Sequence, residues 1–131
     1  MAQPLERITH GAEKNATHSI IWLHGLGADG NDFVPILPQL ELRPTTRITF
    51  PHAPVRPITL NYGMPMRGWY DIKDLSFEQR DEDLAGIEAS AAQILAIAKE
   101  EEQRGIPAEN LLYAGFSQGG VLALYLGLRH P

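Results

Sequence analysis

One pentapeptide, Gly115–Gly119, constrains the fold of this chain more than any other part of its sequence. It reads Gly-Phe-Ser-Gln-Gly, which has the pattern G-x-S-x-G. An apolar run, Leu111–Ala114, precedes it, and the residues from Gln118 to His130 have a helical pattern. Because the glycines two positions before and after Ser117 lack side chains, a strand and a helix can approach closely on either side of the serine. The pattern therefore predicts a sharp strand-to-helix turn with Ser117 at its tip.

The rest of the chain alternates between strand patterns and helix patterns. Short, continuous apolar runs indicate strands that are buried on both faces, as in a parallel sheet. The elements expected before the turn are a strand at 19–23, a short helix at 33–40, a strand at 47–50, a long helix from 76 to about 104, and a strand at 111–114. This order predicts an α/β fold, with a mostly parallel central sheet and helices on both faces.

Local signals set the ends of the two helices in the middle of the chain. Asn31 or Asp29 is expected to cap the short helix, which Pro38 makes irregular. A capping-box pattern at Ser76–Gln79 starts the long helix, and Gly105 ends it. Acidic residues favour the first turns of a helix, and here they are Asp81, Glu82 and Asp83. Apolar residues at helical spacing form its expected buried stripe: Leu84, Ile87, Ala91, Ile94, Leu95 and Ala98.

A proline-rich stretch follows the strand at 47–50. It contains Pro51, Pro54, Pro57 and Pro65 and is expected to be a long loop. Long loops within a compact domain are usually functional, so this segment is a candidate wall of a binding site.

Composition excludes several classes of function. The chain has 131 residues, enough for one domain, and a net charge of −5 with no basic run, which argues against a nucleic-acid surface. It contains no cysteine, so disulfides, zinc–thiolate sites and thiol catalysis are excluded. The first seven residues lack the apolar stretch of a signal peptide, and no apolar run is long enough to cross a bilayer. A cytoplasmic protein is the expectation.

Ser117 in this setting is a candidate nucleophile for acyl transfer. Such chemistry needs two N–H donors for the oxyanion of the tetrahedral intermediate. The Gln118 amide, directly after the serine, is one candidate. The other is the Leu26 amide, because the turn formed by His24, Gly25, Leu26 and Gly27 follows the first buried strand.

Plainer interpretations of these residues stay open at this point. Ser117 is alternatively a helix N-cap between flexible glycines, and the 24–27 turn an ordinary strand-to-helix connection. The spacing of Gly25, Gly27 and Gly30 also matches the dinucleotide pattern G-x-G-x-x-G. Against a nucleotide site, the second strand ends Phe50-Pro51-His52, without the acidic residue that would bind a ribose.

The chain resembles the phospholipase/carboxylesterase family, which includes acyl-protein thioesterases and bacterial carboxylesterases. The resemblance rests on four blocks in family order: Ile21–Asp29, Phe50–Pro54, Gly68–Ile72 and Gly115–Gly120. It implies an α/β-hydrolase fold with Ser117 as nucleophile and the Leu26 and Gln118 amides as the oxyanion hole. It also implies that the 55–75 region walls an acyl pocket. Leu60, Met66 and Trp69 are the candidate substrate-binding residues by type, with plain packing as the alternative.

The base and the acid that activate such a serine are not evident. The residues after Ser117 contain no Asp or Glu and a single histidine, His130. His130 would lie about 20 Å along the same helix at about 1.5 Å per residue, too far to reach the serine. His24 is expected to hold its loop by hydrogen bonds, and His52 to approach the site. Either is a weak candidate for a substitute base, since no orienting carboxylate is evident.

The resemblance implies that the triad Asp and His lie outside this segment, so residues 1–131 are expected to be one incomplete domain, the N-terminal part of the fold. The strand at 111–114 would then expose an apolar edge, for which a second copy or a complementary C-terminal fragment is the expected partner. The expected substrate is an ester or thioester, with short-chain esters, lysophospholipids and acylated proteins left open, and no cofactor or metal is expected. Two other hypotheses are kept: a catalytically inactive fragment or interaction module of the same fold, and the nucleotide-binding turn.

Overall fold

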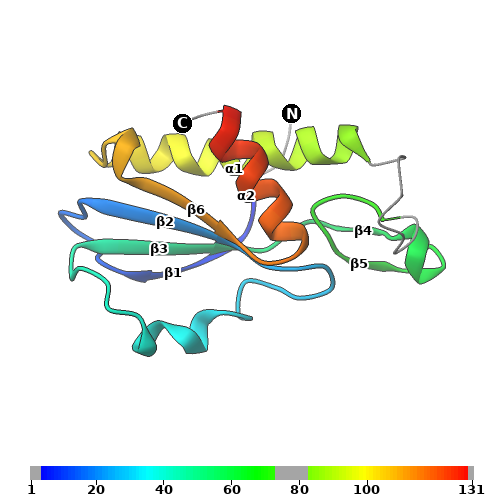
Figure 1. The fold of residues 1–131 in the computed structure, drawn as a ribbon, viewed down its shortest axis with the longest axis horizontal. Coiled ribbons are helices and arrows are strands. Elements are labelled where there is room, and N and C mark those ends of the chain that lie inside the picture. Colours follow the sequence, from blue (N-terminus) through cyan, green and yellow to red (C-terminus); the bar gives the residue numbers. More distant parts are fainter. Residues whose placement is uncertain (1–3, 73–82, 130–131) are drawn as a thin grey trace.

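The structure, a computed structural model, describes residues 4–72 and 83–129. Its centre is a four-stranded sheet in the order β1-β3-β2-β6, and a second, two-stranded sheet pairs β4 with β5 (Figure 1). The strands are β1 (Arg7–Gly11), β2 (His18–Leu23), β3 (Thr46–Pro51), β4 (Val55–Pro57), β5 (Pro65–Arg67) and β6 (Leu111–Gly115). The helices are α1 (Leu84–Gln103) and α2 (Gln118–Arg129), with 3-10 helices η1 (Val34–Gln39), η2 (Thr59–Asn61) and η3 (Ala108–Asn110).

The central sheet is largely parallel, as predicted. β2 pairs in parallel with β3 on one side and with β6 on the other, so that Ile20 lies beside Ile48 and Leu112. The strand β1, which the sequence analysis did not predict, pairs antiparallel with β3. Its sequence, Arg-Ile-Thr-His-Gly, has no apolar run, because it is an edge strand with most of its side chains exposed.

The two faces of the sheet are covered differently. Ile21 and Leu23 of β2 point into a core cluster with α1 and α2, whose members include Ile94 and Leu122. The alternate residue Ile20 points into a smaller cluster that packs against η1 on the other face. Since side chains of a strand alternate between faces, both clusters follow directly from the register of β2. Among residues 4–72 and 83–129, the helices expected on both faces are two α-helices on one face and a 3-10 helix on the other.

The short helix is irregular, as predicted, and differs from its prediction in its cap. It is a 3-10 helix with a proline in its first turn and Pro38 inside, where a missing N–H prevents a regular α-helix. Phe33 is its N-cap and makes no side-chain cap bond, so neither Asn31 nor Asp29 caps it. The Asp29 carboxylate instead accepts a hydrogen bond from the Asn31 amide at 2.8 Å, which lowers its pKa.

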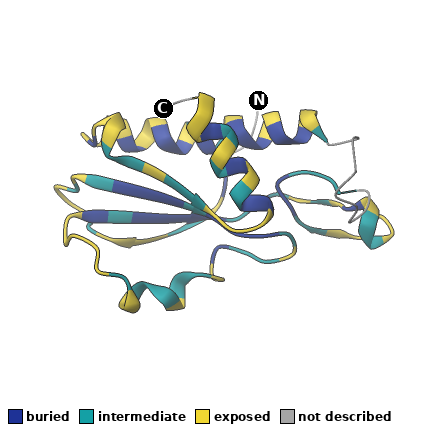
Figure 2. Ribbon diagram, viewed as in Figure 1, coloured by how far each residue is buried: buried dark blue, intermediate teal, exposed yellow. Residues whose placement is uncertain are grey.

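The helix α1 shows its predicted stripe with one exception. Ile87, Ala91, Ile94 and Ala98 are buried in the core, and the buried side of α1 faces the sheet (Figure 2). Leu84 is 55% exposed and lies outside the core cluster, in which the first residue of α1 is Ile87. Leu95 is partly buried against the cluster.

Both ends of α1 are capped in common ways. Asp83 is the N-cap, and its carboxylate accepts from the Gly86 amide at 2.9 Å. Gly105 follows the C-cap Arg104 with φ +102°, a conformation that glycine adopts without strain. The predicted capping box at 76–79 and the acidic residues at 81 and 82 lie outside the described residues. None of the described helices combines the length and apolar character needed to cross a membrane.

The proline-rich stretch is more ordered than the predicted loop. β4 and β5 form a small antiparallel sheet, with Arg56 beside Met66, and η2 closes its end. Backbone hydrogen bonds tie it down at Gly68 N to Pro54 O (3.1 Å) and Leu60 N to Ile72 O (2.8 Å).

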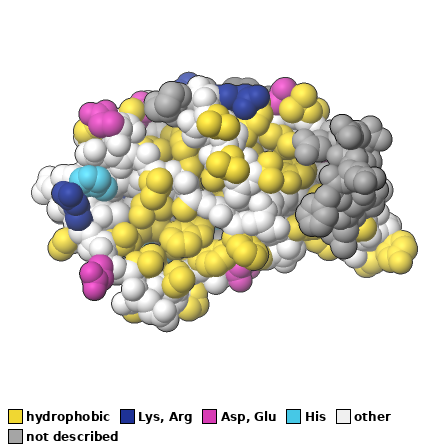
Figure 3. Space-filling model, viewed as in Figure 1, with side chains coloured by type: hydrophobic (Ala, Val, Ile, Leu, Met, Phe, Trp, Pro, Cys, Tyr) yellow, Lys and Arg dark blue, Asp and Glu magenta, His cyan; other side chains and the backbone are white. Residues whose placement is uncertain are grey.

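The strand β6 pairs with β2 alone and forms one edge of the described sheet. The prediction of a strand buried on both faces is wrong for Leu112, which is 57% exposed because no described element covers this side of β6. Figure 3 shows hydrophobic side chains gathered on this side of the molecule. We call the exposed apolar residues of β6, the turn and α2 the open β6–α2 face: Leu112, Phe116, Val121, Leu124 and Leu128.

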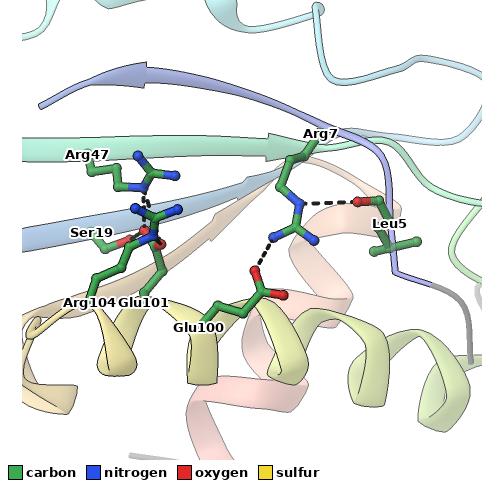
Figure 4. Close-up of polar contacts among 7 residues, drawn as sticks. All are labelled: Leu5, Arg7, Ser19, Arg47, Glu100, Glu101 and Arg104. Carbon is green, nitrogen blue, oxygen red and sulfur yellow. Dashed lines mark hydrogen bonds and ion pairs between the residues drawn. The ribbon is translucent and has the colours of Figure 1, made fainter. Parts of the chain in front are cut away.

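A buried ionic cluster fastens the C-terminal end of α1 to the sheet (Figure 4). The Glu101 carboxylate is at its centre and is 2% exposed. It accepts from the Ser19 hydroxyl at 2.7 Å and from Arg47 Nε at 3.1 Å, and it pairs with Arg104 Nε at 3.2 Å. Ser19 and Arg47 are second residues of β2 and β3, so the cluster lies at the amino ends of the parallel strands.

Candidate active site

The structure places Ser117 at the tip of the turn between β6 and α2. Its side chain is exposed and its φ is +56°, in the left-handed region that non-glycine residues rarely occupy. The turn is tied down on both sides: the Phe116 amide donates to Leu23 O at 3.1 Å, and the Val121 amide donates to Ser117 O at 3.2 Å. The strained backbone thus holds the hydroxyl outward, at the carboxyl end of β6 and the amino end of α2.

The two glycines of the pentapeptide are required by close backbone approach. A Cβ on Gly115 would lie 2.2 Å from Gly119 O, inside the turn itself. A Cβ on Gly119 would lie 2.1 Å from Leu23 O and 2.6 Å from His24 O. The start of α2 therefore rests directly on the backbone where β2 ends, which brings the 24–27 loop beside Ser117.

The 24–27 loop lies against the serine. A Cβ built on Gly25 would be 3.5 Å from both the Ser117 Cβ and Phe116 O. Gly27 has φ +79°, and its amide donates to Arg67 O at 2.8 Å. Within residues 4–72 and 83–129, neither the Leu26 amide nor the Gln118 amide donates a hydrogen bond. The Gln118 amide directly follows the serine in sequence, and the Leu26 amide belongs to the loop that lies against it.

His24 holds the loop from inside the protein. It is buried, its Nδ1 lies 2.7 Å from Gly25 O, and its Nε2 lies 3.0 Å from the Ala53 amide. A carbonyl only accepts and an amide N–H only donates, so Nδ1 carries the proton and Nε2 accepts. Burial lowers the pKa of His24, which favours this neutral form.

Neither His24 nor His52 is arranged as a substitute base. Both ring nitrogens of His24 are engaged with the backbone, and His52 Nδ1 accepts from the Gly30 amide at 3.0 Å. No hydrogen bond joins the Ser117 hydroxyl to a histidine in the described part of the chain. The two histidines serve the glycine-rich loop instead. His130 lies outside the described residues.

A second group of contacts was not predicted from the sequence. The side chain of Gln118 is buried and reaches the backbone of residues 69 and 70. The Trp69 indole Nε1 donates to His24 O at 2.9 Å. The signal for this role was weak: Gln118 is a polar residue between a turn and an apolar helix, where packing alone would favour an apolar side chain.

The candidate substrate-binding residues fall in different environments. Met66 is partly buried, and its sulfur lies 3.6 Å from the position of a Cβ on Gly27, next to the loop. Leu60 is partly buried on η2. Trp69 is 0% exposed and packs in the main core beside His24, with ring centroids 5.3 Å apart. Its contacts in this structure are those of a residue that supports the loop.

The geometry of the glycine loop differs from that of a nucleotide-binding turn. Such a turn presents amides at the start of an α-helix, whereas the helix after Gly30 is the 3-10 helix η1, which starts at Val34. A Cβ on Gly30 would lie 2.5 Å from Phe50 O, so this glycine is required by packing against β3. The loop is directed to Ser117 by the contacts of Gly25.

Comparison with known proteins gives one consistent result. The phospholipase/carboxylesterase family matches residues 5–131. The chain is 42% identical to acyl-protein thioesterase 1 of Neurospora crassa over 119 residues, which are 86% of this chain and 49% of that protein. It is 43% identical to acyl-protein thioesterase 1 homolog 1 of Dictyostelium discoideum over 114 residues, 83% of this chain and 50% of that protein.

Solved structures give the same picture. The crystal structure of Zea mays acyl-protein thioesterase 2 matches with a TM-score of 0.75 at 34% identity, over 92% of this chain and 49% of that chain. The crystal structure of esterase PE8 matches with a TM-score of 0.74 at 30% identity, over 98% and 60%. The chain spans about half the length of the curated relatives that it matches.

Proposed function

The chain belongs to the phospholipase/carboxylesterase family, and from this premise we propose that it acts as a serine hydrolase of carboxylic esters or thioesters through an acyl-enzyme on Ser117. One observation carries the proposal. The exposed Ser117 lies on a strained turn, next to the Gln118 amide and against the loop that carries the Leu26 amide, and neither amide has a partner among the described residues. A hydroxyl with unpaired N–H donors nearby is the arrangement that acyl transfer requires.

In the proposed reaction, the Ser117 oxygen attacks the carbonyl carbon and the carbonyl oxygen becomes an oxyanion. The Leu26 and Gln118 amides donate to that oxyanion, aided by the positive end of the α2 dipole. A histidine from outside this segment, oriented by a carboxylate, takes the serine proton and gives it to the leaving alcohol or thiol. Water then attacks the acyl-enzyme by the reverse path, which releases the carboxylic acid and regenerates the serine. No cofactor or metal takes part in these steps.

The substrate class is proposed from the relatives. Two of them are named acyl-protein thioesterases, which favours a thioester on an acylated protein over a simple oxygen ester. We propose that Met66, which lies beside the 24–27 loop, and Leu60 line the acyl pocket. Trp69 is proposed to support the wall of this pocket from the protein core. Comparing the hydrolysis rates of a thioester and an oxygen ester with the same acyl chain tests this preference.

A fluorophosphonate probe, which reacts with activated serines, tests the nucleophile. We expect labelling at Ser117, located by mass spectrometry, when the folded chain is combined with the segment that supplies the histidine, and its loss in Ser117→Ala. Thr9→Ala, which removes an exposed hydroxyl on β1, is the matched control and keeps the labelling. Absence of labelling in this folded combination contradicts the proposal and favours a catalytically inactive module of the same fold.

We further propose that a second copy or a complementary C-terminal fragment covers the open β6–α2 face. The proposal rests on the exposure of this face and on the greater length of the relatives. Light scattering with intact-mass measurement tests it. A soluble, monomeric species of 14.5 kDa contradicts it, and a dimer or a complex with a second polypeptide supports it.

A further inference from the structure

The two proposed oxyanion donors come from distant parts of the chain. The Leu26 amide belongs to the loop after β2, and the Gln118 amide opens α2. An oxyanion hole works only if both N–H groups are held about 3 Å from one oxygen position before the reaction begins. Some contact between the two segments must therefore fix their separation.

The side chain of Gln118 provides the first part of such a contact. Its Oε1 accepts from the Trp69 amide at 2.7 Å, and its Nε2 donates to Tyr70 O at 2.7 Å. Two hydrogen bonds to successive residues hold the 69–70 backbone at a fixed distance from the start of α2. The side chain is 2% exposed, so these bonds are shielded from water.

Trp69 provides the second part. Its indole donates to His24 O, and the His24 ring donates in turn to Gly25 O, directly before Leu26. The Ser90 hydroxyl of α1 donates to Trp69 O, which fixes the residue from the helix side. A continuous chain of hydrogen bonds thus leads from Gln118 through Trp69 and His24 to the peptide that carries the Leu26 N–H.

We propose that Gln118 and Trp69 are positioning residues that set the separation of the two oxyanion donors, an inference that rests on the proposed function. Gln118 would then act twice, through its amide as a donor and through its side chain as a spacer. Neither side chain touches the reacting atoms. Removing either one loosens the 24–27 loop, while the bond from the Phe116 amide to Leu23 O keeps the turn and its serine in place.

Gln118→Met tests the spacer, because methionine keeps the length and volume of glutamine and loses both hydrogen bonds. Gln103→Met, at the exposed end of α1, is the matched control, and Trp69→Phe removes the indole donor while keeping an aromatic ring. The first readout is NMR of the folded chain, which needs no activity. The chain has two tryptophans, and Trp22, stacked on Phe33 on the other face of the sheet, is an internal reference.

In Gln118→Met we expect the Trp69 indole N–H to exchange with solvent at least about tenfold faster, since loss of two buried bonds makes local opening easier. The Leu26 amide and the His24 ring nitrogens should shift as well, with Trp22 unchanged. Unmoved Leu26 and His24 signals in folded Gln118→Met would overturn the proposal. So would equal changes at Trp69 and Trp22, which indicate general loosening.

The second readout is steady-state hydrolysis of a thioester, measured with the segment that supplies the histidine present. We expect kcat to fall about tenfold or more in Gln118→Met and Trp69→Phe with KM within about twofold, because misplaced donors weaken transition-state binding. The double variant should lose little more than either single one, since both break one chain of contacts. A rise in KM alone would assign these residues to the substrate wall and overturn the proposal. If Ser117→Ala leaves hydrolysis unchanged, the proposed function fails, and the NMR readout still decides on the spacer.

Discussion

The two ends of β2 carry buried polar networks of different chemistry. At the amino end, Ser19 belongs to a cluster that gathers cationic side chains around the single carboxylate of Glu101. At the carboxyl end, His24 belongs to a neutral network in which the histidine, Trp69 and Gln118 bind backbone groups. One network joins side chain to side chain, and the other joins side chain to backbone.

This difference matches what each end must hold. The ionic cluster fastens a helix to the sheet, for which attraction between charged side chains is sufficient. The neutral network fixes the positions of main-chain amides, and only bonds to the backbone itself can do so. The comparison predicts that damage at the amino end changes stability more than site geometry, and that damage at the carboxyl end changes geometry and pH response.

Glu101→Leu should have the largest effect on stability. It leaves Arg47, whose side chain is 12% exposed, with its buried charge uncompensated, and breaking a buried pair costs about 3–5 kcal/mol. Urea unfolding measures the loss. Glu100→Leu removes the half-exposed partner of Arg7 and should cost less than about 1 kcal/mol. Equal losses in the two variants would show that the buried cluster is not the anchor.

Gly119→Ala should have the next largest effect. The added Cβ would meet the Leu23 and His24 carbonyls at 2.1 Å and 2.6 Å, and overpacking against rigid backbone costs about 3 kcal/mol. Gly127→Ala in the same helix meets nothing within 4 Å and should stabilise the chain by about 0.5–1 kcal/mol. Thermal unfolding compares the two, and effects of the same sign would contradict close backbone approach at the turn.

The pH response should come from His24. Burial lowers the pKa of His24 below the ordinary histidine value of 6.5, so below pH 6.5 the unfolded state binds a proton that the folded state does not. Stability should therefore fall as pH drops from 6.5 towards the lowered pKa, by at most about 1.4 kcal/mol per pH unit. Urea unfolding between pH 5 and 7 measures the slope. His24→Gln should flatten it and the exposed His10→Gln should not; a slope unchanged in His24→Gln would remove His24 as its source.

Arg104→Gln should have the smallest effect. Arg104 is the outer partner of Glu101, and its side chain is 50% exposed, so solvent screens the pair and the loss should stay below about 1 kcal/mol. Salt should reduce this loss further. A loss as large as that of Glu101→Leu would place the main stabilising contact of the cluster on α1 itself, outside the sheet.

The sequence predicted most elements because their signals are local. The apolar runs became β2, β3 and β6, and the glycines at 115 and 119 marked the turn that holds Ser117. β1 escaped prediction because an exposed edge strand is held by backbone pairing, which leaves no apolar pattern. The short helix was predicted to be irregular from Pro38, and it is a 3-10 helix with a second proline in its first turn.

The supporting contacts of the site were harder to predict. Gln118 meets Trp69 and Tyr70 across 49 and 48 positions of sequence, and no periodicity in one sequence reports such a pairing. Glu101 did carry a signal, because it continues the helical spacing of Ile94 and Ala98 along the buried stripe of α1. A charge on an apolar stripe indicates a buried partner, although it does not say which residue that partner is.

At Ser117 the left-handed backbone lowers the stability of the fold, while the proposed reaction requires the serine hydroxyl. Glycine would adopt φ +56° with about 1 kcal/mol less strain. Where the hydroxyl is not needed, a serine-to-glycine substitution at this site should therefore be favoured. A descendant that does not need the proposed catalysis should lose the serine early and become more stable by doing so. Serine that is kept at this position in related sequences with the same turn therefore indicates selection for the hydroxyl.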